Sequence, residues 1–121
     1  MRICSDKGHV SVVNDQIGSP TYAGDLALAI LNIITQLKNE KVEIYHYSNL
    51  GKCSWYDFAR EIVKLSGQKC EVIPISSKAF NSKVKRPNFS LLNTEKIQEV
   101  FKFAIPHWKI SLENCILKIN G

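Results

Sequence analysis

The order in which apolar residues change their spacing is the feature that most constrains the fold of this chain. A β-branched run at 10–13 is followed by 23–38, whose apolar residues recur every three or four positions. The segments 42–47, 55–66 and 70–75 continue the alternation, which predicts strand, helix, strand, helix and strand. Strands that alternate with helices favour an α/β fold.

Local end signals support the two central helices. Ser54 is expected to be the N-cap of helix 55–66, with Asp57 completing a capping box, and Gly67 stands where a C-cap glycine would. The apolar spacing within 23–38 predicts that one broad face of that helix is buried.

The remainder of the chain predicts a long loop and two further helices. Residues 76–93 have no clear period, and Thr94 is expected to be the N-cap of a helix over 95–101. A last helix over 109–119 follows Trp108, which we expect to anchor it. The prediction is therefore about three short strands and four helices.

Three strands are few for a sheet that helices cover on both faces. With 121 residues and 45% hydrophobic composition, the chain has the size of one globular domain, 1–121. We therefore expect this domain to be part of something larger, or to lean on another chain.

Composition excludes several classes of protein. The net charge of +5 suits an anionic partner, but no run of five or more basic residues occurs. Because there is no basic helix, RNA-binding aromatic motif or helix-turn-helix signature, a nucleic-acid partner is not expected. The first ten residues lack the apolar region of a signal peptide, and no apolar run approaches the roughly 18 residues that span a membrane.

The four cysteines form no C-x-x-C pair and have no histidine at metal-ligand spacing, so a zinc site is not expected. Together with the missing signal peptide, they predict a cytoplasmic protein with reduced thiols and no membrane association.

Catalytic and cofactor motifs are absent from the sequence. It contains no glycine-rich dinucleotide or P-loop pattern, no G-x-S-x-G elbow and no Tyr-x-x-x-Lys pair. The three histidines form no motif either. We therefore expect no catalytic residue, no metal ligand and no cofactor-binding residue on this chain.

Two loops have the residues to bind a ligand. Gln16, Ser19 and Thr21 precede a helix start, where backbone N–H groups favour an anion, although a plain turn with an N-cap has the same composition. Arg86 stands before Pro87, which stiffens the backbone and presents the guanidinium as a fork suited to phosphate. A surface arginine in a loop is the alternative.

Four segments taken together resemble a known family. They are VVNDQIGSPTYAGDLALAI, IYHYSNLGKCSWYDFAREIVKLSG, RPNFSLLNTEKI and IPHWKISLENCI, which cover 10–119. Their order and spacing resemble the C-terminal part of dTDP-4-dehydrorhamnose reductases, which are Rossmann-type extended short-chain dehydrogenases/reductases. The resemblance implies that the chain is the substrate-binding portion and that the N-terminal NAD(P)-binding half, with its Tyr-x-x-x-Lys pair, is absent.

The resemblance also implies a function. The family reduces the 4-keto group of dTDP-4-dehydro-β-L-rhamnose with NADPH or NADH to give dTDP-L-rhamnose, a precursor of bacterial polysaccharides. This chain would bind the dTDP-sugar, would be inactive alone and would bind no cofactor alone. Its expected partner is a Rossmann half, on the same parent chain or a separate one, and a homo-oligomer is allowed. The alternative is a non-catalytic regulatory or interaction subunit with the same fold.

Residue by residue, the resemblance implies a substrate-binding site. The loop before the first helix faces the substrate, and the arginine-proline motif lies in a loop that closes over the diphosphate. The residues carried over are Gln16, Pro20, Thr21, Arg86, Pro87 and Ser90. Trp55 also lies in a family motif, but its spacing predicts that it packs beneath its helix.

Overall fold

The computed structural model describes residues 8–38, 41–82 and 84–120, and has a mixed α/β architecture. Within these ranges the elements follow one another as β1 (His9–Val13), β2 (Ile17–Gly18), α2 (Ala23–Ile34), β3 (Cys53–Ser54), α3 (Trp55–Ser66), β4 (Glu71–Ile75), α4 (Ser77–Phe80), α5 (Glu95–Phe101) and α6 (Trp108–Asn120). The strands predicted at 10–13 and 70–75 are confirmed, as are the helices at 55–66, 95–101 and 109–119. Two very short strands and the one-turn α4 come from segments predicted to be loop.

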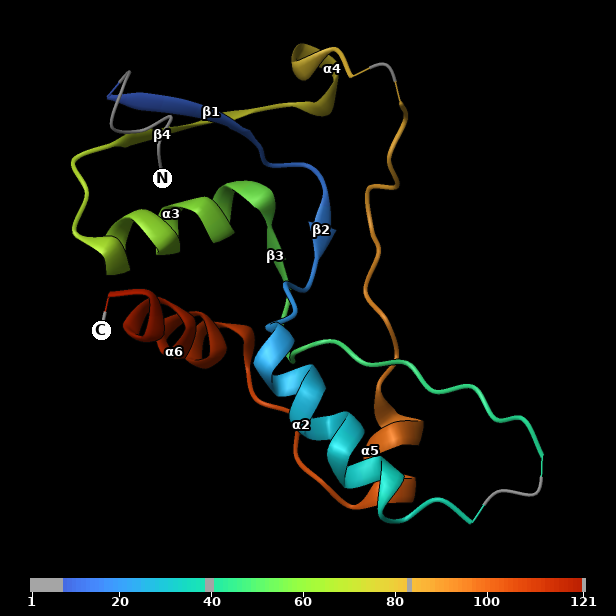
Figure 1. Cartoon of the computed structure of the whole chain (residues 1–121). Coiled ribbons are helices and arrows are strands. Elements are labelled where there is room, and N and C mark those ends of the chain that lie inside the picture. Colours follow the sequence, from blue (N-terminus) through green and yellow to red (C-terminus); the bar gives the residue numbers. More distant parts are fainter. Residues whose placement is uncertain (1–7, 39–40, 83, 121) are drawn as a thin grey trace.

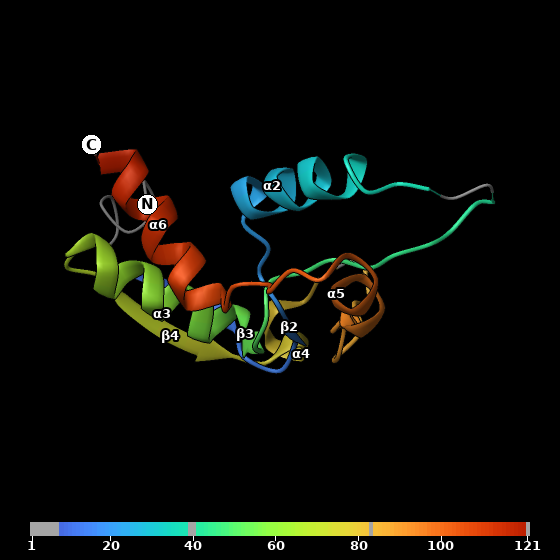
Figure 2. The same cartoon turned by 90° about the horizontal axis from the view of Figure 1, so that it is seen from below.

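The elements form two groups at opposite ends of an elongated molecule (Figure 1). At one end β1 and β4 lie side by side, α3 packs against both strands, and α6 packs against α3. Figure 2 shows this end as successive layers of strands, α3 and α6. At the other end lie α2 and α5, with the extended chain that connects α2 to β3. Beyond α4, residues 84–94 run down to α5 and join the two ends.

The two sheets each contain two strands. β1 pairs with β4 in parallel, from His9 opposite Glu71 to Val13 opposite Ile75. Parallel neighbours require a crossover connection, and here α3 provides the helical part of it. β2 pairs antiparallel with β3, which places Ile17 opposite Ser54. This second pair holds the loop after β1 against the start of α3.

The strand predicted at 42–47 is wrong. This segment has no regular secondary structure, and no described residue pairs with it as a neighbouring strand. The alternation behind the prediction is real, because Tyr45 and Tyr47 are half-buried against α5 while Val42 is 95% exposed. A strand needs a neighbour to complete its hydrogen bonds, and the residues of one segment do not reveal whether that neighbour exists.

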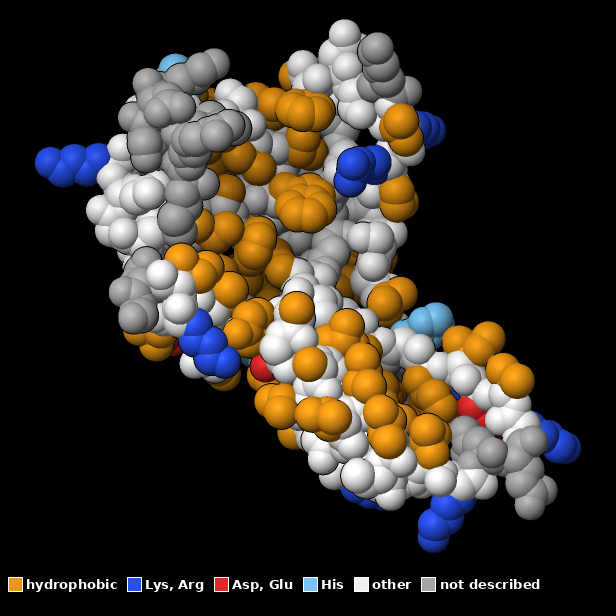
Figure 3. Space-filling model, in the orientation of Figure 1, with side chains coloured by type: hydrophobic (Ala, Val, Ile, Leu, Met, Phe, Trp, Pro, Cys, Tyr) orange, Lys and Arg blue, Asp and Glu red, His pale blue; other side chains and the backbone are white. Residues whose placement is uncertain are grey.

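The burial predicted for the first helix is also wrong. α2 ends at Ile34, four residues earlier than predicted, and Ala29 is its only buried residue. The exposed aliphatic side chains on or just after it are Leu26, Leu28, Ile30, Leu31, Ile34 and Leu37. Figure 3 shows these hydrophobic side chains gathered on the surface over α2. The spacing correctly predicts an apolar helix, but most of that surface has no described element packed on it.

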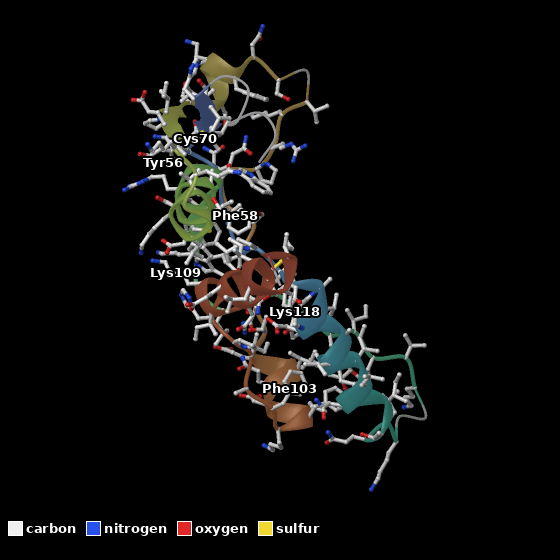
Figure 4. The ribbon with its side chains drawn as sticks, turned by 60° about the vertical axis from the view of Figure 1, so that its left-hand side comes forward. Tyr56, Phe58, Cys70, Phe103, Lys109 and Lys118 are labelled. Atoms are coloured by element: carbon white, nitrogen blue, oxygen red, sulfur yellow. The ribbon has the colours of Figure 1, made fainter. Side chains whose placement is uncertain are left out.

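Two small cores hold the ends together. The first contains Trp108, Leu112 and Ile116 of α6, with Phe58 of α3 packed against them. Figure 4 shows Phe58 between α3 and α6. Trp108 is 3% exposed, which confirms it as the anchor of the last helix. The second core lies around α5, and its buried members are Ile97, Phe101 and Ile105.

The cysteines differ from one another. Cys53 and Cys115 have free thiols, and burial together with the nearby Asp57 raises the pKa of the Cys53 thiol to about 11. Cys70 is disulfide-bonded, so the prediction of reduced thiols is wrong for this residue. Of the helices in the described part of the chain, none is long and apolar enough to cross a membrane.

The predicted capping box at α3 is confirmed in both directions. The Asp57 N–H donates to Ser54 Oγ at 3.0 Å, and the Ser54 N–H donates to Asp57 Oδ2 at 3.0 Å. The hydroxyl of Ser54 also donates to Asp57 Oδ2, at 2.7 Å. These hydrogen bonds, with that of the hydroxyl first, lower the pKa of the Asp57 carboxyl. Gly67 ends the helix with a φ of 65°, as predicted.

Replacing Asp57 by alanine is expected to lower the free energy of unfolding by about 1 kcal/mol at pH 7. Because the pKa of Asp57 is lower in the folded chain, its contribution is complete above the ordinary value of 3.8 and is lost as the pH falls through the folded value. Urea unfolding of D57A and the parent at pH 7 and at pH 2.5 measures both effects. The same replacement at the exposed Glu99 of α5 is the control and should change stability by less than about 0.5 kcal/mol. An equal loss of stability at both pH values would contradict the prediction.

Candidate functional site

The two predicted ligand-binding loops meet at β2, although about 70 residues of sequence separate them. The Ile17 N–H donates to the carbonyl of Asn88 at 2.8 Å, and the Ser90 N–H donates to the carbonyl of Ile17 at 2.9 Å. These bonds form a parallel bridge between Ile17 and Phe89. Gly18 permits the close approach, since a Cβ there would lie 3.0 Å from Ser90 Oγ. The arginine-proline motif is thereby held beside the loop that begins at Gln16.

A cavity of about 430 Å³ opens between these loops and the start of α3. Figure 3 shows a hollow on this side of the molecule, with hydrophobic side chains around it and a basic side chain near its rim. The residues that line the cavity are Gln16, Ile17, Gly18, Ser19, Pro20, Cys53, Ser54, Trp55, Phe58, Val84, Arg86, Pro87 and Ser90.

Five of the six residues assigned by resemblance therefore lie around one cavity: Gln16, Pro20, Arg86, Pro87 and Ser90. The sixth, Thr21, is exposed and lies outside this lining. It borders a separate hollow between the same loop and α6. The structure brings the five together, and their role as substrate ligands stays a prediction.

Among the described residues that line this cavity, Arg86 is the only basic one. No carboxylate of the described residues lies within ion-pair distance of its guanidinium. No described carboxylate therefore occupies its N–H donors. A guanidinium of this kind suits the oxygens of a phosphate or carboxylate, which it can contact with two parallel hydrogen bonds.

Gln16 is held by a hydrogen-bonded group between the first loop and α4. Its Nε2 donates to Ser77 Oγ at 2.8 Å, and Ser77 Oγ donates to Asp15 Oδ1 at 2.6 Å. The Ser77 N–H donates to both carboxylate oxygens of Asp15 at 3.0 Å. These bonds, with that of the hydroxyl first, lower the pKa of the Asp15 carboxyl. The bond from Nε2 to Ser77 holds the carboxamide of Gln16 against α4.

The packing predicted for Trp55 is wrong. It begins α3, yet its side chain is 52% exposed and borders the cavity. Trp55 and Phe58 are three residues apart, the spacing of one continuous buried face of a helix. The core shared with α6 ends at Phe58, however, and Phe58 itself lines the cavity. A helical pattern predicts which face points inward, but not how far along the helix the neighbour reaches.

The hydrogen-bond centre behind the cavity wall was not predicted from the sequence. Asn49, 1% exposed, accepts from the Tyr22 N–H with its Oδ1 at 2.7 Å and donates from Nδ2 to Asp25 Oδ2 at 2.7 Å. Nδ2 also lies 2.9 Å from the Oγ of the buried Ser111, which in turn donates to the Asp25 carboxylate. Asn49 thus joins the start of α2 to α6.

The same residue also holds the cavity loop through its backbone, because Ser19 Oγ donates to the Asn49 carbonyl. A third bond from Nδ2, to the carbonyl of Pro106 at 3.2 Å, reaches the segment before α6. In the sequence, Asn49 stands before Leu50 and Gly51 and indicates only a turn. Its partners lie from 24 to 62 residues away, so no local signal could have identified the group.

The ends of β1 and β4 do not form a cradle for a dinucleotide. Such a site needs a turn between a strand and a helix whose first N–H groups face a phosphate. β1 leads into β2 instead of a helix, and the N–H of Ser77, at the start of the short α4 after β4, is bound to Asp15.

A family model and two curated relatives each match nearly the whole chain. The family model described as RmlD substrate binding domain matches residues 1–120. The spore coat polysaccharide biosynthesis protein SpsK of Bacillus subtilis is 36% identical over 112 residues, which cover 93% of this chain and 38% of that protein. The dTDP-4-dehydrorhamnose reductase of Aggregatibacter actinomycetemcomitans is 32% identical over 123 residues, which cover 94% of this chain and 42% of the reductase.

A solved structure extends the comparison to three dimensions. The dTDP-4-dehydrorhamnose reductase of Bacillus anthracis, in complex with NADP, superimposes with a TM-score of 0.88 and 33% identity. The match covers 97% of this chain and 41% of that one. The chain thus spans about two fifths of the length of its relatives and has the fold of that part of the reductase.

Proposed function

Because the chain belongs to the RmlD substrate-binding domain family, we propose that it is the nucleotide-sugar-binding part of a dTDP-4-dehydrorhamnose reductase. Such an enzyme reduces dTDP-4-dehydro-β-L-rhamnose to dTDP-L-rhamnose with NADPH or NADH. One observation carries the proposal: Arg86, without a carboxylate partner among the described residues, borders the same cavity as Gln16, Pro20, Pro87 and Ser90.

The role proposed for Arg86 is to bind the diphosphate. A nucleoside diphosphate brings negative charge to the cavity, and a charge-assisted hydrogen bond to an arginine is among the stronger polar interactions in proteins. Pro87 restricts the backbone of Arg86 and so reduces the freedom that is lost on binding. Gln16, already held by Ser77 on one side, supplies a positioned carboxamide.

Reduction itself is proposed to take place with a second unit. NADPH or NADH supplies the hydride when it is bound there, in a part of the parent enzyme to which this chain does not correspond. The residues of this chain bind the nucleotide sugar, orient it and keep its diphosphate away from water. For this reason the chain alone is expected to have no reductase activity.

Two features of the described surface support a partner of that kind. The aliphatic side chains of α2 are exposed in one contiguous region, which is uncommon on a chain that acts alone. Nearby, 42–47 alternates as a strand does but has no paired neighbour among the described residues. A Rossmann unit has both a sheet that can accept a further strand and apolar surface that α2 could cover.

Titration of the 121-residue chain with dTDP, followed by NMR, tests the proposal. Shifts at millimolar ligand are expected to concentrate at 16–20 and 86–90, the two segments that border the cavity. An unchanged spectrum there at millimolar dTDP would contradict the proposed binding role. Reductase activity of the purified chain alone would contradict the proposal that the chemistry requires a second unit.

The alternative function is a non-catalytic interaction or regulatory subunit. The exposed apolar surface of α2 favours it as much as it favours a catalytic partner, and the sequence has no Tyr-x-x-x-Lys pair. The two functions differ in the cavity, since a purely interacting subunit has no need to bind dTDP. Absent dTDP binding, with a stable complex to a partner through α2, would favour this alternative.

A further inference from the structure

A second, polar cavity lies between α3 and the start of α6. It has a volume of about 530 Å³, and most of its lining consists of charged side chains. From α3 it uses positions 57, 60, 61 and 64, whereas the cavity that Arg86 borders uses positions 55 and 58, on another face of the helix. Among the described residues, Cys53 alone lines both cavities, so the two hollows are separate.

The backbone brings two lysines from distant segments to this cavity. Two hydrogen bonds of 2.9 Å join Leu50 to the residues on either side of His107 and form a parallel bridge between Leu50 and His107. Gly51 permits the close approach, because its φ is 88° and a Cβ there would collide with the imidazole of His107. Lys52 and Lys109 each stand two residues after the bridge, and both line the cavity.

The charges around this cavity are unbalanced. Its described lining contains four basic residues, Lys52, Arg60, Lys64 and Lys109, and two acidic ones, Asp57 and Glu61. Both carboxylates are already engaged: Asp57 Oδ2 accepts from the backbone and hydroxyl of Ser54, and Glu61 lies 3.3 Å from Lys64 Nζ and 3.9 Å from Lys109 Nζ. The lining therefore has a formal net charge of +2.

The cations of Lys52 and Arg60 have no carboxylate of the described residues within ion-pair distance. The guanidinium of Arg60 lies over the ring of Tyr56, 5.6 Å from its centroid, which favours one orientation of the group. Lys109 is paired only through its 3.9 Å contact with Glu61, which is long for an ion pair. A planar guanidinium with ammonium groups around the same hollow is suited to phosphate oxygens.

We propose that this second cavity is a binding site for a small molecule with two or more phosphate groups. Arg60 contacts one phosphate with its fork of N–H donors, while Lys52 and Lys109 neutralise the remaining negative charge. A volume of about 530 Å³ admits a ligand larger than a single phosphate. The inference is independent of the proposed function, because none of the residues given a role in dTDP-sugar binding lines this cavity.

The test uses inorganic pyrophosphate as the probe and the 121-residue chain with Arg86→Ala as the host, so that Arg86 does not contribute. In an NMR titration, shifts are expected to concentrate at 52, 57–64 and 109. R60A in this host should weaken pyrophosphate binding about tenfold, because a charge-assisted hydrogen bond is lost. K78A is the matched control: Lys78 is exposed on α4, outside this lining, and its removal should change the affinity little.

Glu61 gives a test in the opposite direction. E61Q removes the carboxylate that Lys64 and Lys109 share, so pyrophosphate should bind severalfold more tightly. E99Q makes the same change of charge at an exposed position of α5 and should leave the affinity unchanged. Equal effects of R60A and K78A, or of E61Q and E99Q, would indicate only general electrostatic attraction and overturn the inference.

The outcomes also separate this inference from the proposed function. Pyrophosphate shifts at 52, 57–64 and 109 in a chain that binds no dTDP would support the second site while the proposed function fails. Binding of dTDP at 16–20 and 86–90, with no pyrophosphate shifts at 52, 57–64 and 109, would overturn the second site and leave the proposed function standing.

Discussion

Replacing Arg86 by alanine is expected to weaken the binding of dTDP at least tenfold. The guanidinium is the only basic group among the described residues of the cavity lining, and a hydrogen bond to a charged group contributes about 1.5–3 kcal/mol. R86K keeps the charge but not the planar fork, so its affinity should lie between those of the parent and R86A. Isothermal titration at low and moderate salt measures the loss and its expected decrease with ionic strength.

The neighbouring Lys85 provides the control for this substitution. Lys85 is exposed, carries the same charge as Arg86 and lies outside the lining of the cavity that Arg86 borders. K85A should therefore change dTDP affinity little. The free energy of unfolding should be nearly the same in R86A and the parent, because Arg86 is exposed and has no ion-pair partner among the described residues. Equal losses of affinity in K85A and R86A would indicate a general charge effect and contradict the role given to Arg86.

Replacing Asn49 by alanine is expected to lower the free energy of unfolding by about 2–4 kcal/mol. The substitution leaves the Tyr22 N–H without its acceptor and removes one of the two donors to the Asp25 carboxylate, the other being the hydroxyl of the buried Ser111. Each buried polar group left unsatisfied costs about 1–3 kcal/mol, and breaking a buried network is among the recognised causes of large losses. Urea unfolding followed by circular dichroism measures the change.

Asn32 provides a matched control on the surface. Its Nδ2 also donates a hydrogen bond, to the Leu28 carbonyl at 3.1 Å, but the residue is exposed, so N32A should change stability by less than about 0.5 kcal/mol. N49D should be destabilising too, and more at pH 7 than at pH 4, because it brings a second carboxylate against Asp25. Equal stability of N49A and N32A would show that the buried group contributes little.

Replacing Asn49 is expected to affect the cavity as well as the stability of the fold. Ser19 lines the cavity and donates to the Asn49 carbonyl, and Tyr22 is tied to the Asn49 side chain. Loosening of this loop should therefore lower dTDP affinity in N49A even under conditions where the chain remains folded. The effect on affinity is expected to be smaller than that of R86A, which removes a group that faces the ligand itself.

The structure changed the interpretation of Trp55 more than that of any other residue. The sequence spacing correctly places Trp55 on the same face of α3 as Phe58, which packs against the core. Whether that face is covered at Trp55 depends on where α6 begins, and no residue near Trp55 carries that information. The same reason explains α2, whose periodicity is correct and whose aliphatic side chains are nevertheless exposed.

The sequence by itself determined the features that depend on neighbouring residues. The capping box of Ser54 and Asp57 begins α3, and its atoms belong to residues only three positions apart. Gly67 ends the helix through its own left-handed backbone conformation. Motif residues likewise led to the resemblance that the family match later confirmed. The tertiary structure alone decided that 42–47 has no paired strand in the described part of the chain, that Trp55 borders a cavity, and that Asn49 joins α2 to α6. These depend on partners up to 62 residues away, and burial and pairing are properties of both partners, so neither segment specifies them alone.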